Sequence, residues 1–181
     1  MGVTACNDLE GTGDKGFVTG DGIIATVALD DRDPAVSYVG DDLDGDPLSI
    51  QDFRGQVVVV AVWGSWCGPC QKEAPWVVGA AEDLGDQVQF VGINVRDASP
   101  AQAQAFERYY GVEFPSLYSP DGEALLAFPG VLTPRSIPAF VVLDGDGRIA
   151  ASIVGPLPSQ QTLVDLTQDV VDEANEGARD G

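Results

Sequence analysis

Residues 57–70 read VVVVAVWGSWCGPC, a run of apolar, mostly β-branched residues followed closely by two cysteines three positions apart. Apolar side chains occupy both alternating faces over residues 57–63, which is the pattern of a central strand covered on each side. The glycine and proline between the cysteines favour the start of a helix, because a first-turn proline lacks only an N–H that would be unpaired anyway. The stretch therefore predicts a buried strand, a turn and a helix that begins at the cysteines.

The two cysteines are suited to thiol–disulfide exchange. Cys67 precedes a helix whose first N–H groups and dipole favour negative charge, so the thiolate form of Cys67 should be favoured. Cys70 lies one turn further on, where it can attack a mixed disulfide between Cys67 and a client. We expect Cys67 to be the nucleophile and Cys70 the resolving thiol. A zinc site would need two further ligands, and the sequence has only one other cysteine and no histidine.

Composition narrows the classes of function. The 29 acidic and 9 basic residues give a formal charge of −20, which repels nucleic acid and the anionic face of a membrane. The absence of histidine excludes a His-based triad, a His metal cage and a His proton shuttle. With 181 residues, 44% of them apolar, the chain fits one domain with its own core. We expect no nucleic-acid partner, no metal and no cofactor.

The N-terminal residues have the composition of a tether. Residues 3–6 read VTAC and resemble the end of a bacterial lipoprotein signal peptide with the cysteine that receives the lipid. An incidental cysteine in an unstructured tail is the alternative interpretation of Cys6. Residues 7–22 are rich in glycine and aspartate and lack periodicity, as in a linker. We expect a flexible tether over residues 1–22, one domain over 23–177 and a C-terminal tail over 178–181.

Strand and helix patterns alternate through the rest of the chain. Two apolar strands within residues 139–154 flank the turn-forming sequence DGDG at 144–147, so they should form an antiparallel hairpin. In chain order we predict a small hairpin within residues 23–50, a helix from the cysteines to about residue 84 with a kink at Pro75, a strand at 88–95, a helix near 100–110, an amphipathic stretch at 122–128, a hairpin at 139–154 and a helix at 159–176.

Residues 48–75, LSIQDFRGQVVVVAVWGSWCGPCQKEAP, resemble the TlpA/ResA branch of the thioredoxin superfamily. The segments FVGINVR at 90–96 and FPSLY at 114–118 resemble it too, as does Ile137-Pro138 before a strand. The resemblance covers roughly residues 43–170 and implies an α/β, thioredoxin-like fold with a central mixed sheet flanked by helices. An N-terminal hairpin and a helical insertion between the second core strand and the strand after Pro138 complete that expectation.

The resemblance also implies residues that bind the client. Ile137-Pro138 is expected to be a cis peptide beside the cysteines, where the backbone of Ile137 can pair with a client strand. Trp66, Gly68 and Pro69 are expected to shape the exposed rim of the motif. For Trp66, a purely structural role is the alternative.

Glu73 is a third chemical candidate. It follows Cys70 by three residues and so shares a helical face with it. It also matches the glutamate that ResA-like proteins hold near their cysteines, and it could relay the proton that Cys70 must lose. A solvated acid in the first helical turn is the alternative. Thioredoxin itself keeps a buried aspartate where this sequence has Ala61, which leaves the carboxylate role to Glu73 or to water.

In function, the resemblance implies an extracytoplasmic thiol–disulfide oxidoreductase, secreted or anchored as a lipoprotein to the outer face of the bacterial cytoplasmic membrane. Its partners would be protein thiols and disulfides, such as those of apocytochrome c, and a membrane electron donor; we expect a monomer. The Gly-Pro dipeptide fits a reducing enzyme. Two alternatives stay open: an oxidase or isomerase for secreted proteins, and a redox-inactive binding lipoprotein.

Overall fold

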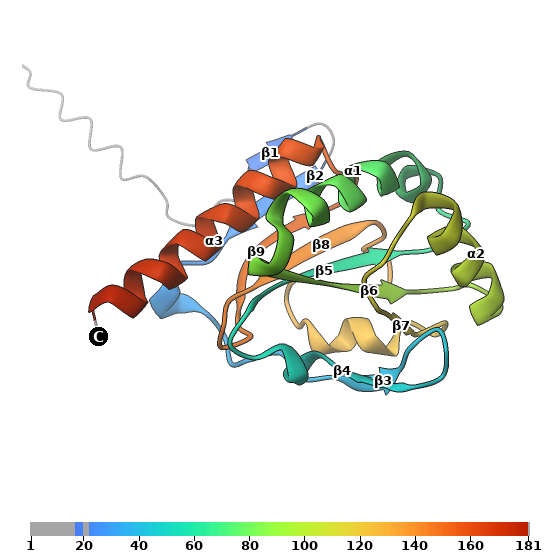
Figure 1. The fold of residues 1–181 in the computed structure, drawn as a ribbon, viewed down its shortest axis with the longest axis horizontal. Coiled ribbons are helices and arrows are strands. Elements are labelled where there is room, and N and C mark those ends of the chain that lie inside the picture. Colours follow the sequence, from blue (N-terminus) through green and yellow to red (C-terminus); the bar gives the residue numbers. More distant parts are fainter. Residues whose placement is uncertain (1–16, 20–21, 181) are drawn as a thin grey trace, which may run out of the picture.

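A seven-stranded mixed sheet forms the centre of the fold in the computed structural model, which describes residues 17–19 and 22–180 (Figure 1). Its strands are Phe17–Thr19 (β1), Gly22–Thr26 (β2), Val57–Trp63 (β5), Val88–Asn94 (β6), Ser116–Tyr118 (β7), Ala139–Leu143 (β8) and Ile149–Val154 (β9). They lie in the order β1-β2-β9-β8-β5-β6-β7. Because β5 pairs in parallel with β6 and antiparallel with β8, the predicted mixed sheet is confirmed.

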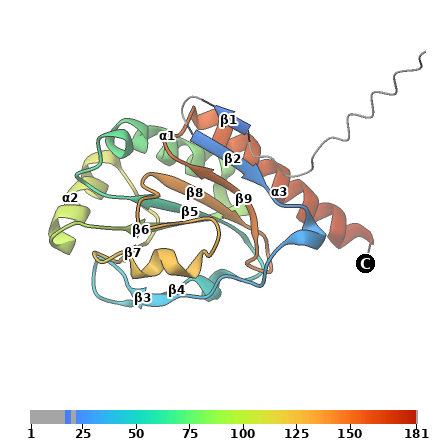
Figure 2. The ribbon, with the colours of Figure 1, turned by 180° about the vertical axis from the view of Figure 1, so that it is seen from behind.

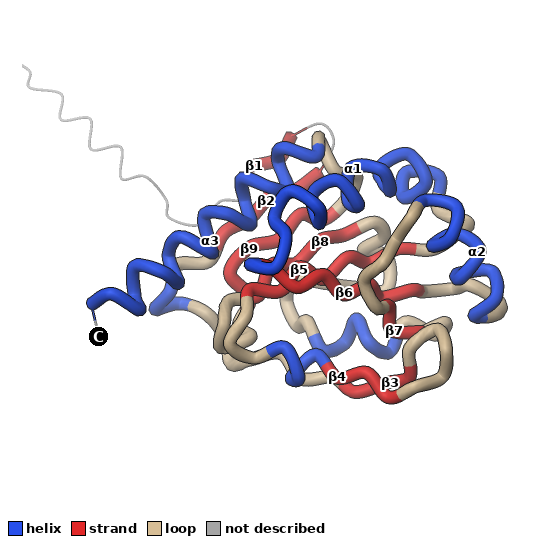
Figure 3. The backbone as a smooth tube through the Cα atoms, viewed as in Figure 1, coloured by secondary structure: helices blue, strands red, loops and turns tan. Residues whose placement is uncertain are grey.

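The other elements are the helices Gly68–Leu84 (α1), Pro100–Tyr110 (α2) and Gln160–Asp180 (α3), the hairpin strands Val39–Asp41 (β3) and Pro47–Ser49 (β4), and the 3-10 helices Leu29–Asp31 (η1), Ile50–Phe53 (η2), Gly85–Gln87 (η3) and Glu123–Ala127 (η4). Helices α1 and α3 cover one face of the sheet (Figure 3). The other face of the sheet is covered by η4 and the β3–β4 hairpin (Figure 2). The predicted insertion after β6 is confirmed and consists of α2, β7 and η4.

Strand β5 is buried along its whole length, because its alternating side chains enter two separate cores. On one face, Val60 belongs to a cluster that includes Leu125 of η4. On the other face, Val59 belongs to a cluster that includes Ala80 of α1 and Leu163 of α3. The prediction of a central strand covered on both sides is therefore confirmed.

The N-terminal part contains two hairpins where the sequence predicts one. Strands β3 and β4 form a separate sheet, whereas β1 pairs with β2, and β2 continues onto β9 of the main sheet. Within the stretch predicted as a tether, Phe17–Thr19 form a strand, since these residue types have high β propensity and pair with the edge offered by β2. Cys6 and the rest of residues 1–16 lie outside the described residues.

Helices α1 and α2 have the predicted bounds, and α1 continues through Pro75; the kink expected there stays a prediction. Helix α3 begins after Ser159, whose Oγ accepts a hydrogen bond from the Thr162 N–H at 3.1 Å, as expected of a cap. It extends to Asp180, into the residues for which a tail is predicted, and Gly177 does not adopt the left-handed conformation that commonly ends helices. None of the described helices is long and apolar enough to cross a membrane.

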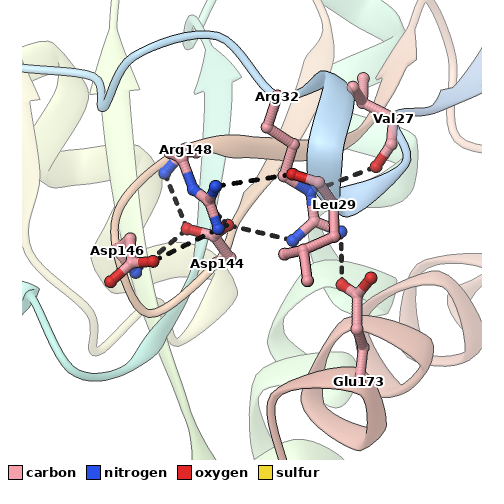
Figure 4. Close-up of polar contacts among 7 residues, drawn as sticks. All are labelled: Val27, Leu29, Arg32, Asp144, Asp146, Arg148 and Glu173. Atoms are coloured by element: carbon pink, nitrogen blue, oxygen red, sulfur yellow. Dashed lines mark hydrogen bonds and ion pairs between the residues drawn. The ribbon is translucent and has the colours of Figure 1, made fainter. Parts of the chain in front are cut away.

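An ion network joins three distant parts of the chain at the end of the sheet where β5 begins (Figure 4). Arg32, just after η1, donates from Nη1 to Oδ2 of Asp144 at 3.0 Å and from Nη2 to Glu173 of α3. Arg148 also binds Asp144, with Nη2 3.0 Å from Oδ2. The side chains of Arg32 and Asp144 are only 4% and 7% exposed, so this central pair of the network is largely shielded from water.

Candidate active site

Cys67 and Cys70 are joined by a disulfide bond, with their Cα atoms 5.2 Å apart. Cys67 occupies the N-cap position of α1, and its Sγ accepts a hydrogen bond from the Cys70 N–H at 3.2 Å. The first sulfur thus lies at the amino end of the helix, where the dipole and the unpaired N–H groups favour negative charge. Both cysteines are buried in this oxidised state.

The Ile137-Pro138 peptide bond is cis, as the resemblance implies. It leads directly into β8, whose Ala139 pairs with Val62 near the end of β5, just before the cysteine motif. Ile137 packs against the apolar cluster that contains Cys67 and Cys70. The sheet therefore brings the two segments together, although about 70 residues separate them along the chain.

The side chain of Glu73 points into the protein and not into solvent. It is 3% exposed, so the alternative of a solvated first-turn acid is wrong. Its Oε2 accepts a hydrogen bond from the Leu157 N–H at 2.7 Å, while Oε1 has no partner among the described residues. Burial raises the pKa of Glu73 to about 7, and the Leu157 N–H partly opposes this rise.

Glu73 and Cys70 line the same small cavity, with a volume of about 30 Å³. The rest of its wall is apolar and comes from β5, β8, α1, α2 and the segment after α2, including the side chains Val62, Trp63, Ala74, Val77, Phe106, Val112, Phe114 and Phe140. In such surroundings a carboxylate has few ways to be solvated. The cavity is thus lined by both Cys70 and the one buried carboxyl group of α1.

Replacing Glu73 by glutamine should flatten the pH dependence of stability. Glu73 binds its proton more tightly in the folded protein, with a pKa of about 7 against an ordinary 4.5, so stability falls as pH rises through this interval. Between pH 5 and pH 8 the loss from this group is roughly 2 kcal/mol. Glu73→Gln should lack that loss when unfolding free energies of the oxidised protein are measured in urea at both pH values.

Glu82→Gln provides the matched control for this measurement, because Glu82 is an exposed acid on the same helix. Its pH dependence should follow that of the wild type. If Glu73→Gln also followed the wild type, the carboxyl group of Glu73 would not be perturbed by burial.

Trp66, Gly68 and Pro69 are exposed and surround the buried Cys67, as the sequence predicts for a rim. Trp66 is 48% exposed, and its Nε1 donates to the carbonyl oxygen of Val95 at 3.0 Å. Trp66 therefore has both a structural bond and an open surface beside the disulfide.

Asp97 belongs to the site but was missed by the sequence analysis. It is buried, and its carboxylate accepts hydrogen bonds from the N–H of Ser65 at 2.9 Å, from the Ser65 hydroxyl, and from Nδ2 of Asn94 at 2.6 Å. These bonds hold the turn that carries Cys67. The signal in the sequence was the position of these residues relative to the predicted strands. Asn94 and Asp97 come at the end of β6, and the cysteines come after β5. Parallel strands bring residues at such positions to the same edge of the sheet.

Comparisons of the sequence with known proteins show similarity to one family and to two proteins named for thiol–disulfide chemistry. The Redoxin family pattern matches residues 28–170. Thiol-disulfide oxidoreductase ResA of Bacillus subtilis is 27% identical over 131 residues, which cover 72% of this chain and 70% of ResA. Thiol:disulfide interchange protein HelX of Rhodobacter capsulatus is 35% identical over 112 residues, 61% of this chain and 60% of HelX.

Solved structures show the same fold. A secreted thiol-disulfide isomerase from Corynebacterium glutamicum superposes with a TM-score of 0.78 at 30% identity, covering 88% of this chain and 99% of the isomerase. A DsbF homologue from Corynebacterium diphtheriae gives a TM-score of 0.75 at 32% identity, with 81% and 92% covered.

Proposed function

The chain belongs to the Redoxin family and is a thiol–disulfide oxidoreductase of the TlpA/ResA-like type, and from this premise we propose that it reduces disulfides of client proteins outside the cytoplasm. The observation that carries the proposal is the Cys67–Cys70 disulfide at the amino end of α1, beside a cis proline and a buried carboxyl group. The Gly-Pro dipeptide between the cysteines favours the reducing direction. The similar secreted isomerase supports the location.

In the proposed reaction, the Cys67 thiolate attacks one sulfur of the client disulfide. A bond forms between Cys67 and the client, and the other client sulfur leaves as a thiolate that takes up a proton. Cys70 then attacks Cys67 Sγ, which releases the second client thiol and leaves the Cys67–Cys70 disulfide. Two electrons pass to the client, and a membrane electron donor returns them to the enzyme.

Glu73 takes the proton of Cys70 in this scheme. With a pKa of about 7, its carboxyl group is partly ionised near neutral pH and can accept a proton there. Cys70 and Glu73 line the same cavity, so the transfer needs at most a short relay. This supports a catalytic role for Glu73, because Ala61 stands where thioredoxin has its buried aspartate and provides no carboxylate.

The client and the anchor are parts of the same proposal. We propose apocytochrome c as a client on the strength of the TlpA/ResA resemblance, with docking along Ile137 and the exposed rim of Trp66, Gly68 and Pro69. Lipidation of Cys6 would hold the domain near the membrane donor.

The reduction potential of the Cys67–Cys70 pair decides the direction of electron flow. For a reductase we expect a reduction potential close to that of thioredoxin, about −270 mV. A potential close to that of DsbA, about −120 mV, would identify an oxidase and overturn the proposal. The measurement equilibrates the protein with defined thiol–disulfide buffers and counts alkylated cysteines by mass. A Cys6→Ser background ensures that only the active pair titrates.

A further inference from the structure

Arg96 has an unusual backbone conformation next to the disulfide. Its φ is +60°, and it is the one residue other than glycine with a positive φ among the described residues. L side chains rarely adopt this conformation, and it persists where surrounding contacts hold it, often at functional sites. Arg96 lies two residues after β6, between Val95 and Asp97, both of which bond the turn that carries Cys67.

The guanidinium of Arg96 connects two separate loops. Its Cζ lies 5.7 Å from the centre of the Trp66 ring, within the range of a cation–π contact. Its Nη2 donates a hydrogen bond to the carbonyl oxygen of Pro134. One side chain thus contacts both the residue before Cys67 and the turn that leads to Ile137-Pro138.

The turn at residues 133–136 has few other ties to the protein. The hydroxyl of Ser136 accepts from the Thr133 N–H at 3.0 Å, and the Ser136 N–H donates to the Thr133 carbonyl at 3.0 Å, so these bonds stay within the turn. Among the described residues, Arg96 is the only one outside the turn whose side chain bonds to it. This guanidinium is therefore the one side-chain link among the described residues between the turn and the segment beside Trp66.

We propose that Arg96 is a positioning residue that holds Trp66 at a fixed separation from the turn at residues 133–136, with the client strand docking between them. This inference rests on the proposed function, in which a client strand pairs with the backbone of Ile137 while its disulfide meets Cys67. Holding Trp66 and the turn in place keeps the client sulfur in line with the Cys67 thiolate. Small displacements of reacting groups reduce rates by up to about 100-fold, so loss of the guanidinium should act on docked clients.

Arg96→Gly separates positioning from folding, because glycine adopts a positive φ without penalty while the guanidinium is removed. We expect kcat/KM for reduction of a disulfide-bonded Cys-x-x-Cys-His peptide to fall at least about tenfold. The single-turnover rate with the small reagent DTNB, which needs no strand pairing, should change less than about twofold, and the unfolding midpoint should not fall. Arg96→Lys, which keeps a charged donor, should recover part of the peptide activity.

Arg108→Gln is the matched control, since Arg108 is an exposed arginine of α2, outside the proposed docking surface, whose side chain makes no hydrogen bond or ion pair among the described residues. Its peptide activity should equal that of the wild type. Equal peptide rates for Arg96→Gly and the wild type would overturn the inference alone, as would an equal loss with DTNB and with the peptide. A wild-type protein that reduced DTNB but not the peptide would overturn the proposed client reaction and the inference with it.

Discussion

Cys70→Ser should accumulate client proteins as mixed disulfides on Cys67, and Cys67→Ser should lose disulfide exchange altogether. Cys67 caps α1, so its sulfur has the stabilised negative charge that the first attack needs. Cys70 is buried and lies within disulfide-bond distance of Cys67, so it is the group in place to resolve the adduct. We expect the rate of peptide reduction to fall at least about a thousandfold in each variant.

The trapping experiment is done without added reductant, which could release the adduct in place of Cys70. Non-reducing gels and mass spectrometry should then show a client joined to Cys67 in the Cys70→Ser variant and no adduct in the Cys67→Ser variant. Cys6→Ser is the control, because it removes the third cysteine and should leave exchange unchanged. Reductase activity at the wild-type level in both active-site variants would refute the mechanism.

Local sequence patterns predicted the parts of the site that depend on local geometry. The run of valines before the motif predicts a strand buried on both faces, and the first-turn proline predicts the start of α1. The cis state of Ile137-Pro138 came from the resemblance to a family. Residue spacing alone does not distinguish it from a trans bond.

The parts that the sequence did not reveal depend on contacts between distant segments. Glu73 is bonded by Leu157, which is 84 positions away, so its burial could not be read from the helix alone. Arg96 reaches Pro134 across 38 positions, and only the fold shows that its guanidinium contacts both this turn and Trp66. Strand β1 was missed because three residues with β propensity stand in a glycine-rich stretch, and pairing with β2 decides their structure.

Asp144→Ala should have the largest effect on stability of the substitutions away from the disulfide. Asp144 accepts from Arg32 Nη1 at 3.0 Å and from the Arg148 N–H at 2.9 Å, and its loss leaves the buried guanidinium of Arg32 with one acidic partner, Glu173. Removing one partner of a buried ion pair costs about 3–5 kcal/mol when the other charge is left without compensation. Because Glu173 stays paired with Arg32, urea unfolding should report a decrease toward the lower end of that range.

Asp146→Ala is the matched control for this substitution. Asp146 lies in the same turn and contacts Arg148 at 3.3 Å, but its side chain is 79% exposed, so its loss should cost less than about 1 kcal/mol. The double variant Arg32→Met/Asp144→Ala should lose less than the sum of its single variants, since it leaves no buried charge unpaired. Equal losses for Asp144→Ala and Asp146→Ala would show that the network is solvated. Exchange activity of the folded fraction should be unchanged, because the turn at Asp144 and the cysteines lie at opposite ends of β5.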